Sequence, residues 1–268
     1  MTSIPHEIDL LKLYPSQRIL KKMGLIQDQD GIMKRYLNEG ENWESHIKNT
    51  SDFIKECLTG SGAKSVSILG SGWMLDIPQR FLADNFELVL FYDLRHPRQL
   101  KHKYRKQRNF QFIEMDLTGG ILEKAYRVLN GKRKVNISNL EEELIVPPLK
   151  FPIYSDFIVS VNILNQLDIL IVDYLKGKIE IPNTIIERLR RNIQQNHLNI
   201  LEPGKSLLIT DFEEISLDSD REKLGSKPLI YTALPQPKKQ NQWTWKFDTQ
   251  FTYHQNCLTN FEVMALMF

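Results

Sequence analysis

Two glycines and an aspartate follow two apolar runs in the spacing of a nucleotide-binding turn. The first run ends in Gly70-Ser71-Gly72, and the next ends at Asp93, 23 residues after Gly70. Glycine lets the backbone approach a ligand closely, and a carboxylate at the tip of the neighbouring strand can accept both hydroxyls of a ribose. The spacing therefore predicts a ribose site. A tight structural turn at the glycines and a helix cap at Asp93 are the plainer alternatives.

Three more apolar runs also end in a polar residue. These residues are Asp116, Asn162 and Asp211. Ligands of an open parallel sheet bind outside the carboxyl ends of its strands, so the five ends are expected to converge on one crevice. The runs are 65–69, 88–92, 110–115, 156–161 and 206–210.

From residue 64 onward, strand patterns alternate with helical patterns, which predicts an α/β fold. We expect a Rossmann-like, mostly parallel, seven-stranded sheet with helices on both faces. Two β-rich segments, 243–251 and 261–268, predict a closing antiparallel hairpin. A polar connection is expected at 213–237, and an excursion at the rim of the sheet, with a short helix at 138–144, is expected within 131–152. The predicted helices are 74–84, 97–107, 119–129, 164–175 and 183–198.

Residues 8–58 have the periodicity of several helices. Asn49-Thr50-Ser51-Asp52 could cap the last of them, which carries Phe53 and Leu58. The segment has too little apolar surface to fold alone, so we expect it to lie over the carboxyl edge of the sheet. The predicted organisation is an N-terminal helical lid at 1–58 and a Rossmann-like domain at 59–268.

Five short segments of the chain resemble the class I, Rossmann-like S-adenosylmethionine-dependent methyltransferases. They are Ile-Leu-Gly-Ser-Gly at 68–72, Tyr-Asp at 92–93, Glu-Met-Asp-Leu at 114–117, Val-Asn-Ile-Leu at 161–164 and Leu-Glu-Pro-Gly-Lys at 201–205. The resemblance covers residues 50–268 and implies S-adenosylmethionine as the cofactor. The cofactor contacts that it implies are Leu69, Gly70, Ser71, Gly72, Asp93, Leu94, Asp116, Leu117 and Asn162.

The chain departs from the family pattern at two places. The acid that often precedes the glycine motif is missing, and Met74 stands where a further glycine is common. A non-catalytic binding or scaffold protein of the same fold is therefore an alternative. An NAD-dependent oxidoreductase is a weaker one, because its fingerprint needs a glycine at the position of Leu75.

Several site residues keep a second interpretation. Asp116 could bind the adenine amino group or cap the helix that follows, and Asn162 could be a turn residue. Trp43 and His46, one helical turn apart, could contact a substrate or anchor the lid. Methyl transfer needs a base only when the nucleophile is protonated. The candidates for that base are His46, Asp211 and Glu213.

The composition limits the partners of the chain. Its 268 residues carry 35 basic and 33 acidic side chains, a formal net charge of +2, so no global field attracts nucleic acid or anionic membrane. The basic run 95–108 is expected to be a solvated helix face, with nucleic acid contact as the alternative. Cys57 and Cys257 are expected to be reduced thiols, and no metal site is predicted. The chain lacks a basic and apolar leader, so it is expected in the cytoplasm. Its near-neutral charge and its helical lid favour a small-molecule substrate. The oligomeric state is not predicted.

Overall fold

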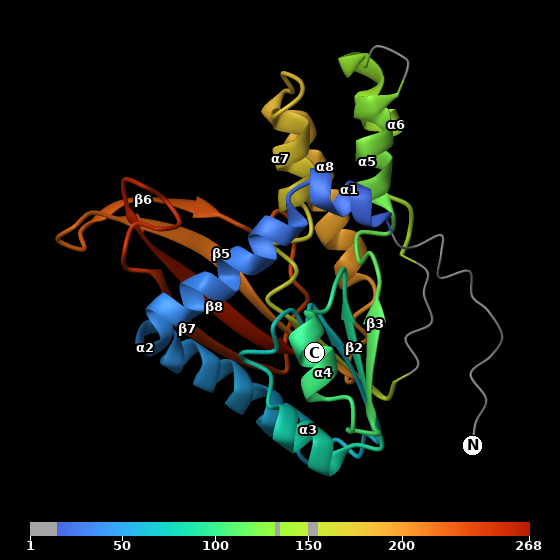
Figure 1. Ribbon diagram of the computed structural model, residues 1–268, viewed down its shortest axis with the longest axis vertical. Helices are drawn as coiled ribbons and strands as arrows, with labels where there is room; N and C mark the ends of the chain where they lie inside the picture. Colours follow the sequence, from blue (N-terminus) through green and yellow to red (C-terminus); the bar gives the residue numbers. More distant parts are fainter. Residues whose placement is uncertain (1–14, 132–134, 150–154) are drawn as a thin grey trace.

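The computed structural model describes residues 15–131, 135–149 and 155–268, which build helices on both faces of one sheet (Figure 1). The strand order along the main path of the sheet is β3-β2-β1-β4-β5-β8-β7. Strands β1 to β5 are parallel to one another, and β8 and β7 are antiparallel to their neighbours. This confirms the predicted fold class. The strands are β1 (Ser65–Leu69), β2 (Leu88–Asp93), β3 (Phe110–Glu114), β4 (Phe157–Val161), β5 (Ser206–Leu217), β6 (Lys223–Pro228), β7 (Lys239–Asp248) and β8 (Leu258–Met267).

The sheet of the described residues has eight strands, one more than predicted. The polar connection expected at 213–237 in fact holds the second half of β5 and the whole of β6. Strand β4 ends at Val161, opposite Ile209, so the rest of β5 loses that neighbour and pairs with β6 instead. All six residues of β6 are exposed, and Leu224 is the one large apolar residue among them. No apolar alternation therefore marks this strand in the sequence.

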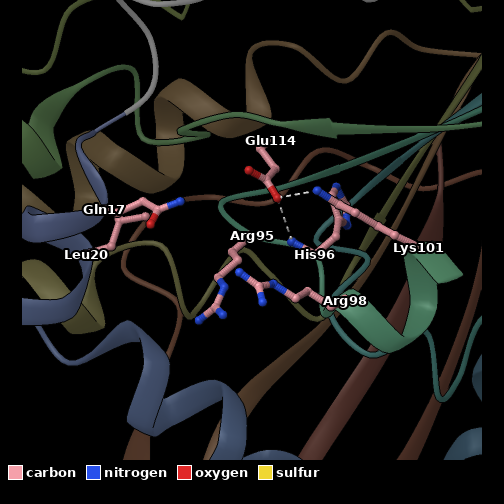
Figure 2. Close-up of a pocket in the computed structure, with 7 residues that line it drawn as sticks. All are labelled: Gln17, Leu20, Arg95, His96, Arg98, Lys101 and Glu114. Carbon is pink, nitrogen blue, oxygen red and sulfur yellow. Dashed lines mark hydrogen bonds and ion pairs between the residues drawn. The ribbon is translucent and has the colours of Figure 1, made fainter.

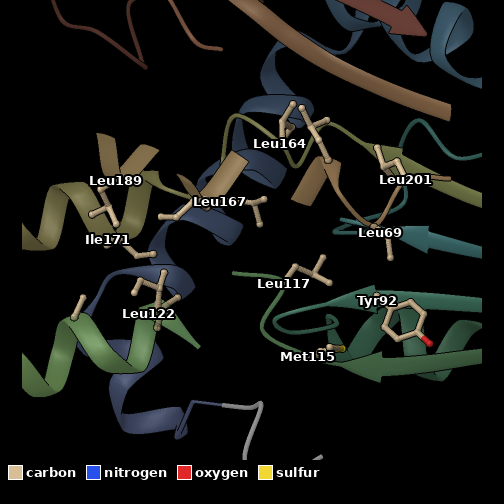
Figure 3. Packing of buried hydrophobic residues seen from close by; sticks show 14 of the residues in the cluster. Leu69, Tyr92, Met115, Leu117, Leu122, Leu164, Leu167, Ile171, Leu189 and Leu201 are labelled. Atoms are coloured by element: carbon tan, nitrogen blue, oxygen red, sulfur yellow. The ribbon is translucent and has the colours of Figure 1, made fainter. Parts of the chain in front are cut away.

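Buried strand residues alternate between two hydrophobic clusters. Val66 and Ile68 of β1 face the cluster that includes α2 and α3, whereas Leu69 faces the cluster formed with α5, α7 and α8 (Figure 3). This period of two is what a sheet covered by helices on both faces requires. The helices are α1 (Gln17–Lys22), α2 (Leu25–Leu58), α3 (Gln79–Asn85), α4 (Arg98–Lys103), α5 (Ile121–Asn130), α6 (Leu140–Glu143), α7 (Ile169–Lys176) and α8 (Asn183–Leu198).

The helix prediction was accurate for α8 but too long for α3, α4 and α7. Bends precede Gln79 and turns precede Ile169, and a turn follows Lys103 at the end of α4. In the excursion at the rim, α6 confirms the predicted short helix. Residues 132–134 and 150–154 of that excursion lie outside the described residues.

The N-terminal segment contains the short helix α1 and one long helix, α2, where several helices were predicted. Helix α2 runs for 34 residues and passes through the expected cap without a break. Thr50 is buried inside the helix, and Asp52 accepts hydrogen bonds from Lys48 and Lys55, at 2.8 and 3.1 Å. Side-chain pairs one turn apart and packing against β7 therefore outweigh the capping preference of these residues. Residues 8–14 of the predicted helices lie outside the described residues.

Helix α2 packs mainly against β7 of the sheet (Figure 1). Its start, its residue His46 and α1 reach the carboxyl edge. Leu20 of α1 belongs to the cluster that contains Leu117 and Leu164, which follow β3 and β4. The division into a lid and a body stays a prediction. Both cysteines are free thiols, as expected. In the described ranges, no helix combines the length and the apolar character that a membrane span requires.

Candidate functional site

Gly70 is fixed by the close approach of the loop after β4. Its φ is +80°, and a Cβ on it would lie 2.5 Å from Ile163 Cβ and 2.8 Å from the carbonyl oxygen of Val161. Its amide donates to the carbonyl of Tyr92 at 2.9 Å. Packing inside the protein therefore explains this glycine, a reason that differs from the expected space for a cofactor.

Gly72 differs from Gly70 because its surroundings are open. Its φ is +45°, and a Cβ built on it would meet no heavy atom of the described chain within 4 Å. The Gly72 amide donates to Asp93 Oδ2 at 2.8 Å, and the Arg95 amide donates to Asp93 Oδ1 at 3.3 Å. A carboxylate has about four lone-pair positions, so Asp93 keeps acceptor capacity for a ligand. Asp93 therefore fixes the glycine loop, and its oxygens have lone pairs beyond those used by these two bonds.

Ser71 and His96 connect the glycine loop to the loop after β2. Ser71 Oγ lies 3.4 Å from His96 Nδ1, and His96 Nε2 lies 3.2 Å from the carbonyl oxygen of Ile113. Burial lowers the pKa of His96, although Asp93 acts in the opposite direction. A neutral ring that donates from Nε2 and accepts at Nδ1 satisfies both contacts. His96 therefore connects the loops after β1 and β2 to the end of β3.

Asp116 uses one carboxylate oxygen for its own loop and leaves the other without a partner. Oδ1 accepts from the amide and the hydroxyl of Thr118, at 2.8 and 2.6 Å. Oδ2 is buried and unpartnered. Burial raises the pKa of Asp116 to about 6, although the Thr118 bonds lower it. The turn function and an acceptor function therefore coexist on this side chain. The adjacent Leu117 is buried, and Leu94, after Asp93, is half-buried.

A cavity of about 250 Å³ opens between α1 and the ends of β2 and β3. Figure 2 shows Arg95 and Arg98 beside it, with Glu114 bonded to Lys101 and to the amide of His96. It is lined by Gln17, Leu20, Arg95, His96, Arg98, Lys101 and Glu114. Arg95, Arg98 and Lys101 of the basic run 95–108 line this cavity. Most basic side chains of the run are exposed, in agreement with the expected solvated face. Neither the glycine loop nor Asp93 lines it.

At the end of β4, Asn162 lies in a network with the N-terminal segment. Asn162 has φ +48°, and its Nδ2 donates to Asp76 Oδ2 at 2.7 Å and lies 3.3 Å from His46 Nε2. Trp243 Nε1 donates to His46 Nδ1 at 3.1 Å, and the His46 ring stacks on Trp245 at 3.8 Å between ring centroids. The sequence placed His46 and Asn162 in one site, and the structure brings them together.

Asp211 belongs to the same region, and Glu213 does not. Asp211 is 2% exposed, and its Oδ2 accepts from Asn165 Nδ2 at 3.4 Å. Burial raises the pKa of Asp211 to about 7, and the carboxyl of Asp76 acts in the same direction. Glu213 is paired with Lys223 of β6 at 3.8 Å, so the structure places it on the β5–β6 arm. The prediction of Glu213 as a candidate base was therefore wrong.

Trp43 is a packing residue in this structure. It is 2% exposed, stacks on Phe247 and makes an edge contact with Trp245. Its Nε1 donates to the carbonyl of Phe247 at 2.9 Å. The indole therefore fastens α2 to β7, which supports the alternative that Trp43 anchors the N-terminal segment.

Sequence reasoning missed three residues of this region, Asp76, Asn165 and Trp243. Asp76 stands four residues after Gly72, whereas the family pattern directed attention to an acid before the glycines. Asn165 follows Asn162 by three residues in the same loop. The position of Trp243 on the edge strand β7 could not be found from sequence, because only the sheet order brings β7 near α2.

Comparisons with known proteins give distant structural likenesses. No family model matches the sequence, and no curated protein matches it. The chain is similar to DhpI in its S-adenosylhomocysteine complex (10% identity, TM-score 0.39, 93% of this chain and 98% of that one). It is also similar to the N-methyltransferase NodS from Bradyrhizobium japonicum WM9 (11%, 0.36, 82% and 96%) and to YcgJ from Bacillus subtilis (7%, 0.38, 82% and 98%). All three TM-scores lie below one half.

Proposed function

We propose that the chain binds S-adenosylmethionine at the carboxyl edge of its sheet and is a methyltransferase. The observation that carries the proposal is the bond from the Gly72 amide to Asp93 Oδ2, 2.8 Å long, beside the open face of Gly72. The sheet around this bond has the strand order β3-β2-β1-β4-β5 followed by an antiparallel pair. A mostly parallel sheet with a closing antiparallel hairpin is what the sequence predicted.

The residues present fit this cofactor. Asp93 keeps lone pairs for the two ribose hydroxyls, and the unpartnered Oδ2 of Asp116 can accept from the adenine amino group. Leu94 and Leu117 provide apolar contact on the adenine side, and the open face of Gly72 leaves room for the methionine part. The cofactor supplies an electrophilic methyl group on a sulfonium. The protein then needs to hold and align the acceptor and to exclude water.

A small-molecule acceptor in the cytoplasm fits the chain best. The first helix covers the loops after β3 and β4, and His46 of α2 reaches the end of β4. The formal net charge of +2 offers no general attraction for nucleic acid. The non-catalytic alternative predicted that Met74 or Trp73 would fill the space above Gly72. Met74 packs instead in the cluster of Val66 and Ile68, and Trp73 donates from Nε1 to the carbonyl of Gln29 at 2.7 Å. Both contacts favour the catalytic proposal.

Titration calorimetry of the full chain with S-adenosylmethionine and S-adenosylhomocysteine tests the proposal. We expect micromolar binding of both ligands, lost in Asp93→Ala. The matched control is Asp156→Ala. Asp156 also accepts hydrogen bonds from two backbone amides, those of Lys64 and Ser65 at 2.9 Å, but it lies at the amino ends of β1 and β4. Binding of NAD in place of these ligands, or binding of none of them, would overturn it.

A further inference from the structure

Four polar side chains meet beyond the ends of β1 and β4, beside the part of β5 that follows its last pair with β4. We call Asp76, Asn162, Asn165 and Asp211 the polar cluster. Asn162 donates to Asp76 and Asn165 donates to Asp211, so each carboxylate already accepts one hydrogen bond. One oxygen on each of three members is buried without a partner, namely Oδ1 of Asn162, Asn165 and Asp211. Buried acceptors are normally bonded, so three together call for a donor.

The cluster also has an excess of negative charge. Within the described ranges, neither Asp76 nor Asp211 is ion-paired with a lysine or an arginine. His46 Nε2 is 3.8 Å from Asp76 Oδ2. The indole of Trp243 can only donate, so His46 must accept at Nδ1 and its ring is neutral with the proton on Nε2. Two carboxyl groups therefore lack a cation.

An organic cation suits these groups better than a metal ion. In the part of the chain that the structure describes, no three His, Cys, Asp or Glu side chains are close enough together to hold a metal. An ammonium group, by contrast, carries a positive charge and several N–H donors on one atom. The neighbouring Trp243 provides aromatic surface, which favours alkylammonium ligands, whereas the buried ring of Trp245 is covered by His46.

The polar cluster adjoins the proposed cofactor site. Ile163, next to Asn162, lies against Gly70, and Asp76 follows Gly72 by four residues. A ligand nitrogen held by the cluster is therefore beside the glycine loop, where the methionine part of the cofactor is proposed to lie. This step rests on the proposed function.

We propose that the polar cluster binds the ammonium group of the methyl acceptor, so that the acceptor is an alkylamine. Before the nitrogen can react, one proton passes from it to Asp211 Oδ1, which turns that carboxylate into a carboxylic acid. The freed lone pair forms the new bond from nitrogen to the methyl carbon. The bond from that carbon to sulfur breaks with its electron pair left on sulfur, and the proton leaves Asp211 for water.

Ligand-observed NMR on the full chain, without cofactor, tests the ammonium site. The probes are n-butylamine and phenethylamine at pH 8, each paired with the alcohol of the same skeleton. We expect the amines to bind and the alcohols not to bind. Asp211→Asn should weaken amine binding about tenfold or more, because it removes the charge but keeps the shape. Asp76→Asn is the second variant, and thermal unfolding checks that both are folded.

The matched control is Asp116→Asn, which makes the same substitution at another buried strand-end acid. It should weaken S-adenosylhomocysteine binding and spare the amines, whereas Asp211→Asn should do the reverse. Equal amine binding by the intact chain and Asp211→Asn would overturn the proposal.

The amino-acid end of the cofactor is the other source of an ammonium group. A loss of affinity in Asp211→Asn for S-adenosylhomocysteine, but not for 5′-methylthioadenosine, would assign the cluster to that end and overturn the acceptor role. Amine binding that depends on Asp211, in a chain that binds no S-adenosylhomocysteine, would overturn the proposed function and leave the ammonium site standing.

Discussion

Asn162 donates a 2.7 Å hydrogen bond to Asp76, which joins the loop after β4 to the loop after β1. Asn162 has a left-handed φ of +48°, a conformation that asparagine tolerates better than most residues. The bond therefore holds a strained residue in place beside the glycine loop. His46 of α2 contacts both partners, so the N-terminal segment takes part in the same network.

The two glycines of the loop should respond differently to alanine. Gly70→Ala should destabilise the protein on the order of 2–4 kcal/mol, because the new Cβ would collide with Ile163 and the Val161 carbonyl at a left-handed φ. Gly72→Ala lacks the collision and should cost about 1–2 kcal/mol. Urea unfolding of both variants measures the difference. Equal losses would contradict the packing argument.

Asp211 should make the stability of the protein depend on pH. Its pKa is about 7 in the folded chain, from burial and the nearby Asp76, and about 4 when unfolded. The folded state therefore binds the proton more tightly than the unfolded state. The contribution of Asp211 to the free energy of unfolding is largest at low pH, falls between about pH 4 and pH 7, and is constant above that.

The loss over that range should be roughly 2–4 kcal/mol, and Asp211→Asn should remove it. Urea unfolding of the intact chain and the variant at pH 5 and pH 8 measures this. Asp156→Asn is the control, because Asp156 is exposed and its pKa is lowered by the Ser65 and Lys64 bonds. The same pH response in the intact chain and in Asp211→Asn would refute the assignment.

Asp116 should select the base of the cofactor. Asp116→Asn should lower the affinity for S-adenosylhomocysteine about tenfold, because a charged acceptor for the adenine amino group is lost. Binding of S-inosylhomocysteine, which lacks that amino group, should change little. Calorimetry with both ligands gives the comparison. Thr118→Val, which removes only the hydroxyl bond to Oδ1, distinguishes a loop effect from recognition of the base.

Trp43 should contribute to stability through the contact between α2 and β7. Trp43→Ala should cost about 3–5 kcal/mol, because it removes a buried ring stacked on Phe247. Leu37→Ala on the same helix should cost less than about 0.5 kcal/mol, because Leu37 is 74% exposed. Chemical unfolding monitored by circular dichroism compares them. A small effect of Trp43→Ala would mean that α2 is held elsewhere.

The sequence determined the sheet and the cofactor side of the candidate site. The strands at 65–69 and 88–93 are short and buried on both faces. The polar residues at their ends are local features of the sequence. The pairing of Gly72 with Asp93 was predictable for the same reason, because adjacent parallel strands bring their carboxyl ends together.

The tertiary structure decided what local patterns could not show. The continuity of α2 through Asn49–Asp52 depends on packing against β7. Strand β6 forms because β5 extends beyond the end of β4 and pairs there with β6. The polar cluster joins residues 76, 162, 165 and 211 with a histidine from α2 and a tryptophan from β7. Local patterns predicted Asn162, Asp211 and His46 as site residues, whereas Asp76, Asn165 and Trp243 have no such local signal. Their charges and unpartnered oxygens acquire meaning only when long-range contacts bury them together, since burial makes a missing hydrogen-bond partner costly.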